Sequence, residues 1–318
     1  MAKYRRQLPQ LGDKLFLTDG GIETTLMFHE GMDLPAMAAF TLIPQKDGQE
    51  ALRRYFRRYA ELARSRGAGF VLESATWRAS PDWGSKLGYT RADLAAIKRK
   101  SIGMLEDVRA EFETPASPMV ISGCLGPRGD GYVPGEVMSE AEAEEYHAWQ
   151  VGVFRDTAAD MVTAITMTNV AEAIGITRAA EAAGMPVAIS FTTETDGRLP
   201  TGQLLGEAIE TVDEATAGGP AYYMINCAHP THFADALRSG GSWVRRLRGL
   251  RANASCKSHA ELDAATELDE GDPVEFGVQH AELRRLLPHL TVLGGCCGTD
   301  HRHVEQIGLT CAGLRSAA

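Results

Sequence analysis

Residues 171–191, AEAIGITRAAEAAGMPVAISF, contain a complete switch from a helix to a strand. The first part is a run of good helix formers that ends at Gly184, and a glycine followed shortly by Pro186 is a typical helix stop. The run PVAISF (186–191) is apolar and rich in residues that favour strands. Because the same switch recurs along the chain, it decides the predicted fold.

Seven more apolar runs resemble strands, and longer segments of helical period lie between them. One such segment, residues 139–159, opens with Ser139 and Glu142 at the spacing of a capping box. Eight strand–helix units in a chain of this length favour a closed parallel barrel over an open doubly wound sheet. We therefore predict a single (β/α)8 TIM barrel over residues 1–318. The other predicted strands are KLFLTD (14–19), GFVLES (69–74), PMVISG (118–123), DMVTAI (160–165), AYYMIN (221–226), GLRANA (249–254) and LTVLGG (290–295).

The composition is that of a globular enzyme, with 44% apolar and 23% charged residues. A net charge of −10 disfavours nucleic acid and anionic membranes as partners. The sequence has no glycine-rich phosphate-binding motif after its first strand, and no apolar run long enough to span a bilayer. The N-terminal MAKYRRQLPQLGDK lacks the apolar segment of a secretory signal. We expect a cytoplasmic enzyme that acts on small molecules; the sequence does not indicate its oligomeric state.

The six cysteines of such a protein are expected to be free thiols, metal ligands or catalysts. Two of them, Cys296 and Cys297, are adjacent in VLGGCCGTDH (292–301). Successive side chains of a strand point to opposite faces, so the pair can serve one site only where the backbone leaves the strand. The flanking glycines supply that freedom. Four interpretations follow: a vicinal disulfide, a buried apolar pair, a thiolate nucleophile and a metal site.

In a barrel, the carboxyl ends of the strands meet on the face that carries the active site. Cys227 follows the sixth strand as Cys296 and Cys297 follow the eighth, and three sulfur donors suit zinc. Three protein ligands leave a position for substrate, as in catalytic zinc sites. A histidine could close the site, with His229, His301 and His303 as candidates. The polar residues predicted to share this face are Asp19, Glu73, Ser74, Thr76, Ser122, Gly123, Asn226, Cys227, Asn253, Cys296 and Cys297.

Several motifs together resemble the homocysteine S-methyltransferase family, over nearly the whole chain. The family includes the homocysteine module of cobalamin-dependent methionine synthase, betaine–homocysteine methyltransferase and S-methylmethionine-dependent enzymes. The GGCCGT element with an upstream Asn-Cys pair is specific, whereas the Asp-Gly-Gly element alone is weak. The motifs are LTDGGIETTL (17–26), SGCLGPRGDGY (122–132), the G-x-L-x-x-G of residues 197–202 with Glu207-Ala208, INCAHP (225–230) and GGCCGT (294–299).

The resemblance implies a barrel with Zn2+ held by Cys227, Cys296 and Cys297, and a homocysteine whose sulfur takes the open position. It also implies substrate contacts, carried over to Asp19, Gly20, Gly21, Thr76, Ser122 and Asn226. From the residue types alone, Asp19 could equally be a cap, Gly20 and Gly21 a tight turn, and Thr76 a local turn bond. Trp77, Trp83, Tyr132 and Tyr146 could cage an onium methyl group or simply pack, so the sequence assigns them no role.

Two segments depart from the family pattern. Ile165 stands where a glutamate is usual, and isoleucine cannot bind the substrate ammonium. RANASCKSHAELD (251–263) replaces the usual P-N-x-G and brings Cys256, His259 and Glu261 towards the site. The polar residues 255–273 are predicted to form a long loop after the seventh strand.

We predict a methyltransferase that moves a methyl group from an onium donor, such as S-methylmethionine, S-adenosylmethionine or a betaine, to a thiol. The expected acceptor is homocysteine and the product methionine. The chain is shorter than the cobalamin-dependent members, which favours an onium donor. Three alternatives are a different thiol acceptor, a zinc-binding barrel that regulates without turnover, and an enzyme that uses Cys297 as a covalent nucleophile without metal.

Overall fold

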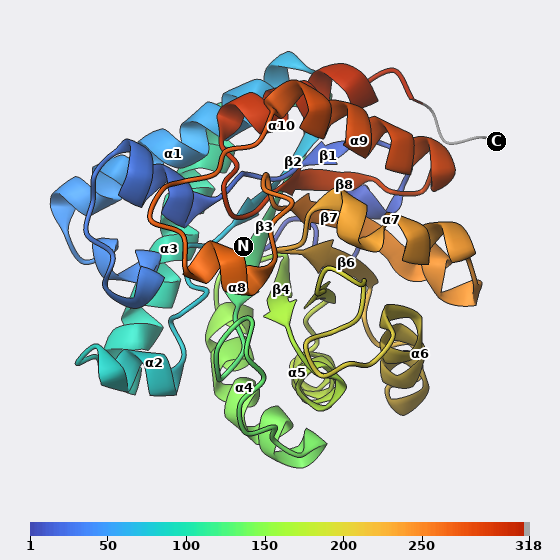
Figure 1. Cartoon of the computed structure of the whole chain (residues 1–318). Coiled ribbons are helices and arrows are strands. Elements are labelled where there is room, and N and C mark those ends of the chain that lie inside the picture. The colour runs from blue at the N-terminus through green and yellow to red at the C-terminus, as the bar shows by residue number, and fades with distance from the viewer. Residues whose placement is uncertain (315–318) are drawn as a thin grey trace.

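The computed structural model describes residues 1–314, so the last four residues of the predicted span 1–318 lie outside the described part. Its strands form a closed barrel in which each strand pairs in parallel with the next and β8 pairs with β1 (Figure 1). The predicted (β/α)8 class is confirmed. The strands are β1 (Phe16–Leu17), β2 (Gly69–Glu73), β3 (Met119–Leu125), β4 (Met161–Met167), β5 (Val187–Thr192), β6 (Tyr222–Asn226), β7 (Leu247–Ala252) and β8 (Val292–Gly295).

Helices surround the barrel, with most of them packed on its outer face (Figure 1). Ser139 caps α4 as its spacing predicts, because its side chain accepts a hydrogen bond from the Glu142 N–H. The helices are α1 (Lys46–Ser65), α2 (Pro81–Lys86), α3 (Arg91–Phe112), α4 (Glu140–Arg155), α5 (Val170–Ala182), α6 (Leu205–Ala215), α7 (Pro230–Ser239), α8 (His259–Asp263), α9 (Pro273–Leu286) and α10 (His301–Cys311). Short 3-10 turns occur at Pro9–Leu11, Pro35–Met37, Ala39–Leu42 and Ser242–Arg246, and Thr24–His29 is π-helical.

The observed strands lie where the sequence predicts them, with shifted ends. β4 runs on to Met167, past the predicted end at residue 165, because its pairing with β5 shifts register between Ala164 and Met167. Thr166 lies in this irregular stretch with a φ of 64°, a conformation that a β-branched residue seldom adopts. The polar stretch 255–273 is a loop that contains the short helix α8, a turn that the sequence prediction did not include.

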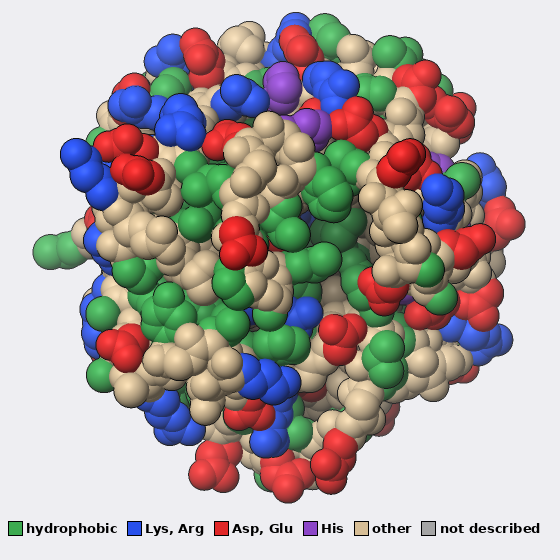
Figure 2. Space-filling model, turned by 60° about the vertical axis from the view of Figure 1, so that its left-hand side comes forward, with side chains coloured by type: hydrophobic (Ala, Val, Ile, Leu, Met, Phe, Trp, Pro, Cys, Tyr) green, Lys and Arg blue, Asp and Glu red, His purple; other side chains and the backbone are tan. Residues whose placement is uncertain are grey.

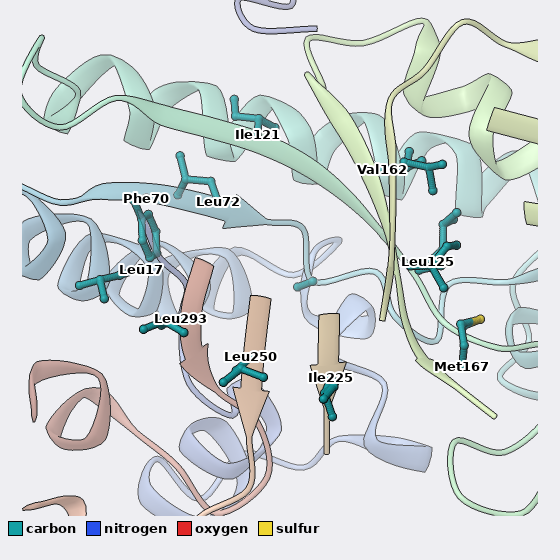
Figure 3. Close-up of a cluster of buried hydrophobic side chains, with 14 of the residues drawn as sticks. Leu17, Phe70, Leu72, Ile121, Leu125, Val162, Met167, Ile225, Leu250 and Leu293 are labelled. Carbon is teal, nitrogen blue, oxygen red and sulfur yellow. The ribbon is translucent and has the colours of Figure 1, made fainter. Parts of the chain in front are cut away.

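The outward-facing side chains of the strands form the larger core of the protein. Figure 3 shows Leu17, Phe70, Leu250 and Leu293 on neighbouring strands, and all four are inaccessible to solvent. Burying a side chain of this size stabilises a fold by about 1.5–3 kcal/mol relative to exposure. The apolar runs are therefore continuous because one side of each strand packs on helices and the other fills the barrel.

The inward-facing side chains change in character along the barrel. Near the amino ends of the strands, residues such as Phe16, Val120 and Tyr222 form an apolar cluster that Leu8 covers. Further along, Ser122 Oγ bonds Thr163 Oγ1 at 2.7 Å. The barrel is thus apolar at its amino end and polar towards its carboxyl end, where a site for polar substrates is expected.

The N-terminal segment closes the amino end of the barrel through Asp160, which is fully buried. Its Oδ1 accepts hydrogen bonds from the Lys3 and Tyr4 N–H groups at 2.6 and 2.7 Å. Its Oδ2 accepts from Arg109 Nη1 at 2.7 Å and from the Ile121 N–H at 2.9 Å. One buried carboxylate therefore ties the N-terminal segment, α3 and β3 to β4.

None of the helices in residues 1–314 combines the length and the apolar character that crossing a bilayer requires.

Candidate metal centre and substrate pocket

Three cysteines come together at the carboxyl end of the barrel. The Sγ atoms of Cys227, Cys296 and Cys297 all lie within 4.8 Å of one another, and those of Cys227 and Cys297 are 3.8 Å apart. Backbone bonds hold them to β7, because the Cys227 N–H donates to Arg251 O at 3.1 Å and the Cys296 N–H donates to Ala252 O at 2.8 Å. The sequence prediction that these three side chains meet is therefore matched by the geometry.

Glycine allows the segment around the cysteine pair to lie against the start of the chain. A Cβ on Gly294 would lie 1.9 Å from Thr18 Oγ1, so any larger residue would push β8 away from β1. Gly298 has a φ of 77°, which lets the backbone turn directly after Cys297. The Gly298 N–H then donates to Thr24 Oγ1 at 3.0 Å. Both sulfurs reach one site because the chain turns here.

Asn226 fixes the turn that carries Cys227. Its Oδ1 accepts from the Thr166 N–H at 2.8 Å and from Ser190 Oγ at 2.6 Å, and its Nδ2 donates to Thr166 Oγ1 at 3.0 Å. Cys227 itself has a φ of 53°, which is uncommon for a residue other than glycine. Strained backbone of this kind persists only where the surroundings enforce it. Asn226 and its partners therefore hold Cys227 in place.

The three thiols do not ionise independently. Hydrogen bonds from Cys227 and Cys297 hold the pKa of Cys296 well below its usual range. Hydrogen bonds with Cys227 and Cys296, together with burial, raise the pKa of Cys297 well above its usual range. The cluster therefore favours a single thiolate, since further negative charges would repel one another. A bound cation removes that repulsion.

The donor set fits zinc in particular. Two thiolates about 2.3 Å from a tetrahedral ion lie about 3.8 Å from each other. The separation of the Cys227 and Cys297 sulfurs is 3.8 Å. Thiolate sulfur is also the donor that soft and borderline ions prefer. Within residues 1–314 no histidine or carboxylate joins this group, so one coordination position would be left for a substrate.

None of the three histidines considered as a fourth ligand joins the cysteine group in residues 1–314, and two of them have other partners. His229 Nδ1 bonds Thr231 Oγ1 at 2.8 Å, and His303 bonds Asp300 and the Glu270 carbonyl. A second group of possible ligands, His29, Glu270 and Asp300, lies apart from the cysteines. Both of its carboxylates already pair with Arg302, at 3.0 and 2.7 Å. The cysteine cluster is therefore the better candidate metal centre.

A cavity of about 310 Å³ opens beside the cysteines. Asp19, Gly20, Gly21 and the three cysteines line it; the sequence analysis predicts substrate-binding roles for the first three and metal ligation for the cysteines. Ile165 lines it as well, so the residue that replaces the family glutamate faces the substrate space. In the space-filling view of Figure 2, hydrophobic side chains gather around a hollow in the surface. The pocket offers largely apolar walls with a few polar groups, as small-molecule sites do.

Three predicted substrate contacts lie outside the lining of this cavity. Thr76 Oγ1 donates to the Cys124 carbonyl at 2.8 Å, and Ser122 faces Thr163 inside the barrel. Asn226 is engaged with Thr166 and Ser190. All three side chains are buried, and the bonds that they make are to other parts of the protein. These three side chains therefore lie behind the wall of the cavity, where they hold neighbouring residues in place.

Arg251 is a pocket residue that the sequence prediction missed. Its Nη2 pairs with Asp19 Oδ1, and its Nη1 pairs with Glu73 Oε2 at 2.8 Å. Tyr55 donates to the other oxygen of Asp19 at 3.0 Å. A signal was present, because Arg251 lies two residues before Asn253 in the predicted strand and therefore points to the same face of it. Asp19 is therefore engaged with protein groups on both of its oxygens.

Tyr132 covers the cysteines from the loop after β3. Its hydroxyl lies 3.3 Å from Cys297 Sγ and 3.6 Å from Cys227 Sγ. Its ring stacks on that of His259 in α8, with 4.2 Å between centroids. His259 Nε2 lies 2.6 Å from the Cys227 carbonyl oxygen, and its Nδ1 lies 3.3 Å from Glu194 Oε1. The segment 251–263 thus reaches the site, as predicted, through His259. Cys256 is exposed and lies outside the cysteine cluster.

Trp77 and Trp83 do not form an empty cage. The guanidinium of Arg78 lies 4.2 Å from the ring centroid of Trp77 and 3.8 Å from that of Trp83. A cation of the protein itself therefore occupies the space between the two tryptophans. Arg78 is buried, and its bonds to the Gly129 carbonyl and to Asp130 are long, at 3.3 and 3.4 Å.

A closed (β/α)8 barrel whose carboxyl end carries three clustered thiols beside a pocket defines a barrel enzyme with a thiol-lined active site. The model of the family described as homocysteine S-methyltransferase matches residues 16–311. The chain therefore belongs to the homocysteine S-methyltransferase family.

Known relatives agree with this assignment. The chain is 25% identical to methionine synthase of Mycobacterium leprae over 328 residues, which cover 96% of this chain and 25% of that protein. It thus spans about a quarter of the length of this curated relative. The oxidized form of the Escherichia coli homocysteine methyltransferase MmuM has a TM-score of 0.74 and 19% identity, covering 96% of this chain and 99% of that chain. The metallated form of the same enzyme has a TM-score of 0.72 and 18% identity, covering 96% of this chain and 98% of that chain. At these identities the structural likeness shows the fold.

Proposed function

We propose that this protein is a zinc-dependent methyltransferase that moves a methyl group from an onium donor to homocysteine and so forms methionine. The observation that carries the proposal is the cluster of Cys227, Cys296 and Cys297, whose sulfurs lie within 4.8 Å of one another, with the Cys227–Cys297 pair at the 3.8 Å that a tetrahedral zinc requires. The relatives that the chain resembles are named for homocysteine methylation and methionine synthesis. Zn2+ is the proposed cofactor.

Zinc in this position would supply a positive charge that keeps a bound thiol deprotonated at neutral pH. A free alkyl thiol has a pKa of about 8.5, so without help only a small part of it is ionised. The three cysteine thiolates would leave a divalent ion with one net negative charge, which preserves electron density on an incoming sulfur. The chain thus provides ligands that favour a reactive substrate thiolate.

The remaining work of the chain is to align two substrates and to exclude water. Methyl transfer from a sulfonium or quaternary ammonium group to a thiolate is an in-line displacement in which opposite charges disappear. A positively charged donor needs no acid to release its leaving group. The cavity beside the cysteines has apolar walls, including Ile165 and Trp77, and Tyr132 covers the sulfurs. These features suit a reaction that water would slow.

The test is a metal assay on purified, reduced protein, followed by methyl transfer to homocysteine from a panel of onium donors. We expect about one zinc per chain and formation of methionine, detected by mass, with at least one of S-methylmethionine, S-adenosylmethionine and betaine. Removal of the metal by a chelator should abolish transfer, and added zinc should restore it. Full activity after chelation, with stoichiometric labelling of Cys297, would instead support covalent catalysis.

A second candidate function is a metal-binding barrel that has lost turnover, and Ile165 in the pocket is the observation in its favour. It predicts bound zinc with no methyl transfer to any thiol. The donor panel separates the two candidates. We also propose that residues 1–318 form a single homocysteine-methyltransferase-like domain.

A further inference from the structure

The acidic side chains of the pocket differ in how they are paired. Five line it, and three of these are bonded to arginines: Asp19 and Glu73 to Arg251, and Asp130 to Arg78. Asp263 is exposed on α8. The fifth, Glu23, is half-buried, and within residues 1–314 no other residue donates a hydrogen bond to its carboxyl or forms an ion pair with it. Asp263 also has no hydrogen-bond or ion-pair partner in residues 1–314, but it is exposed to solvent, so Glu23 is the partly buried carboxylate that the pocket leaves available to a ligand.

The position of Glu23 follows from the start of the chain. It lies four residues after Asp19, directly before the π-helical turn Thr24–His29, and π-helical turns are rare and often occur at functional sites. The peptide before this turn is tied to the end of β8, because the Gly21 N–H donates to the Thr299 carbonyl at 3.0 Å. The same contact network positions Cys296 and Cys297. Glu23 therefore lines the same cavity as the three cysteines, and the charge of Cys296 acts on its carboxyl.

The unpaired state of Glu23 is unfavourable without a ligand. Burial raises the pKa of Glu23 to about 7, against an ordinary value of 4.5. A buried anion of this kind normally finds a cationic partner, because desolvation is costly. Arg251, whose charge lowers the pKa of Glu23, is engaged by Asp19 and Glu73. Arg78, which also feels the charge of Glu23, forms no ion pair with it in residues 1–314. An incoming ammonium group would supply the missing partner.

Arg78 offers the opposite charge in the same pocket. Its guanidinium is buried, its Nε has no partner among the described residues, and its other bonds are long. It therefore retains hydrogen-bonding capacity for a carboxylate, which is the group that a guanidinium recognises best. A free carboxyl, an under-bonded guanidinium and a thiol cluster together complement a zwitterionic α-amino acid that carries a thiol.

We infer that Glu23 is a specificity-determining residue that binds the α-ammonium group of an amino-acid thiol, while Arg78 receives its α-carboxylate. The inference rests on the proposed function in taking the acceptor to be a thiol bound beside the cysteines. It adds the residues that select an α-amino acid over other thiols. The glutamate that is usual at the position of Ile165 then needs no substitute on β4, because the segment after β1 supplies the anionic partner of the ammonium group.

The test compares homocysteine with γ-mercaptobutyrate, which has the same chain and carboxylate but no amino group. Both are titrated calorimetrically into zinc-loaded wild-type protein, Glu23→Gln and the control Glu214→Gln, which changes an exposed glutamate of α6. We expect the wild type and the control to bind homocysteine about 10- to 100-fold more tightly than γ-mercaptobutyrate. Glu23→Gln keeps the size of the side chain and should bring the ratio of the two affinities to about one, mainly by weakening the binding of homocysteine.

A preference for homocysteine that survives in Glu23→Gln overturns the inference, as does a wild type that binds γ-mercaptobutyrate equally well. If Glu23→Gln fails to fold, Glu23→Asp, which keeps the charge and withdraws it by one methylene, should lower the ratio without abolishing it. An unchanged ratio in that variant also overturns the inference. Methyl transfer, measured in parallel, separates this inference from the proposed function. Glu23-dependent binding without transfer to any thiol defeats the function alone, and transfer with no dependence on Glu23 defeats the inference alone.

Discussion

The hydroxyl of Tyr132 lies 3.3 Å from the sulfur of Cys297, at the point where the cysteine cluster faces the pocket. The two residues are separated by 165 positions in the sequence and belong to different strand ends. Tyr132 is held over the sulfurs by its stack on His259, which in turn bonds the Cys227 carbonyl. A substrate thiol that approaches the cysteines must therefore pass or displace this aromatic cover.

Tyr132 should control access to the cysteines. In metal-free protein we expect Tyr132→Ala to raise the rate of alkylation of Cys297 by iodoacetamide about tenfold or more, because thiol reactivity follows exposure. Tyr132→Phe keeps the ring and its stack on His259, so it should change that rate much less. The rates are measured by mass spectrometry of labelled peptides. Equal acceleration in the two variants would show that the hydroxyl group, and not the ring, protects the sulfur.

The three clustered cysteines should be needed for metal binding. Replacing Cys227, Cys296 or Cys297 by serine removes a soft ligand, and we expect zinc content to fall from about one to below about 0.2 per chain. Methyl transfer should fall with it by about a thousandfold or more. The control is Cys256→Ser, since Cys256 is exposed and lies outside the cluster. Full zinc content in any of the three variants would remove that residue from the ligand set.

Asp160 should be important for the stability of the fold. Asp160→Ala leaves the buried Arg109 guanidinium and three backbone N–H groups without their shared acceptor. Removing one partner of a buried ion pair typically costs about 3–5 kcal/mol. We therefore expect the free energy of unfolding in urea to fall by about that amount. The control is Asp156→Asn on the exposed end of α4, which should leave the midpoint unchanged. A small effect of Asp160→Ala would mean that the N-terminal segment contributes little.

Glu23 should lower stability above neutral pH when no ligand is bound. Its pKa in the folded protein is about 7, above the ordinary value of 4.5 that applies to the unfolded chain. The folded state then binds the proton of Glu23 more tightly than the unfolded chain does. The contribution of Glu23 to stability is therefore greatest below about pH 4.5 and is lost as the pH rises through about 7. We expect Glu23→Gln to be more stable than the wild type by about 1–3 kcal/mol at pH 8 and nearly equal to it at pH 5. Urea unfolding at the two pH values tests this, and a gain of the same size at both would contradict it.

Arg251 should hold the two carboxylates that line the pocket. Arg251→Met leaves Asp19 and Glu73 buried without their shared cation. Because Arg251 lowers the pKa of Asp19 against the effect of burial, its removal should raise that pKa further above the present value of about 6. The variant should therefore be strongly destabilised near neutral pH and partly recover stability as the pH is lowered. The control Arg248→Met replaces another arginine of β7. If Arg251→Met has the same free energy of unfolding as the wild type at pH 8, this prediction is wrong.

The barrel could be read from the sequence because each of its parts is local. Gly184 and Pro186 end a helix and start a strand through the properties of their own backbone. Each of the eight predicted runs overlaps an observed strand, since a strand that is buried on both faces is mostly apolar. The ends of β4 could not be read in this way. They depend on a register shift against β5 and on the bonds between Thr166 and Asn226.

The composition of the cysteine cluster was also accessible, because the fold places the carboxyl ends of β6 and β8 on one face and glycines free the backbone around Cys296. The sequence by itself therefore determined the architecture and the thiols of the site. Only the tertiary structure decided the charges of the pocket: Arg251 lies between Asp19 and Glu73, Arg78 between two tryptophans, and Glu23 has no partner among residues 1–314. Such pairings depend on distances of a few ångströms between side chains from separate strands and loops. Local sequence signals do not encode these distances.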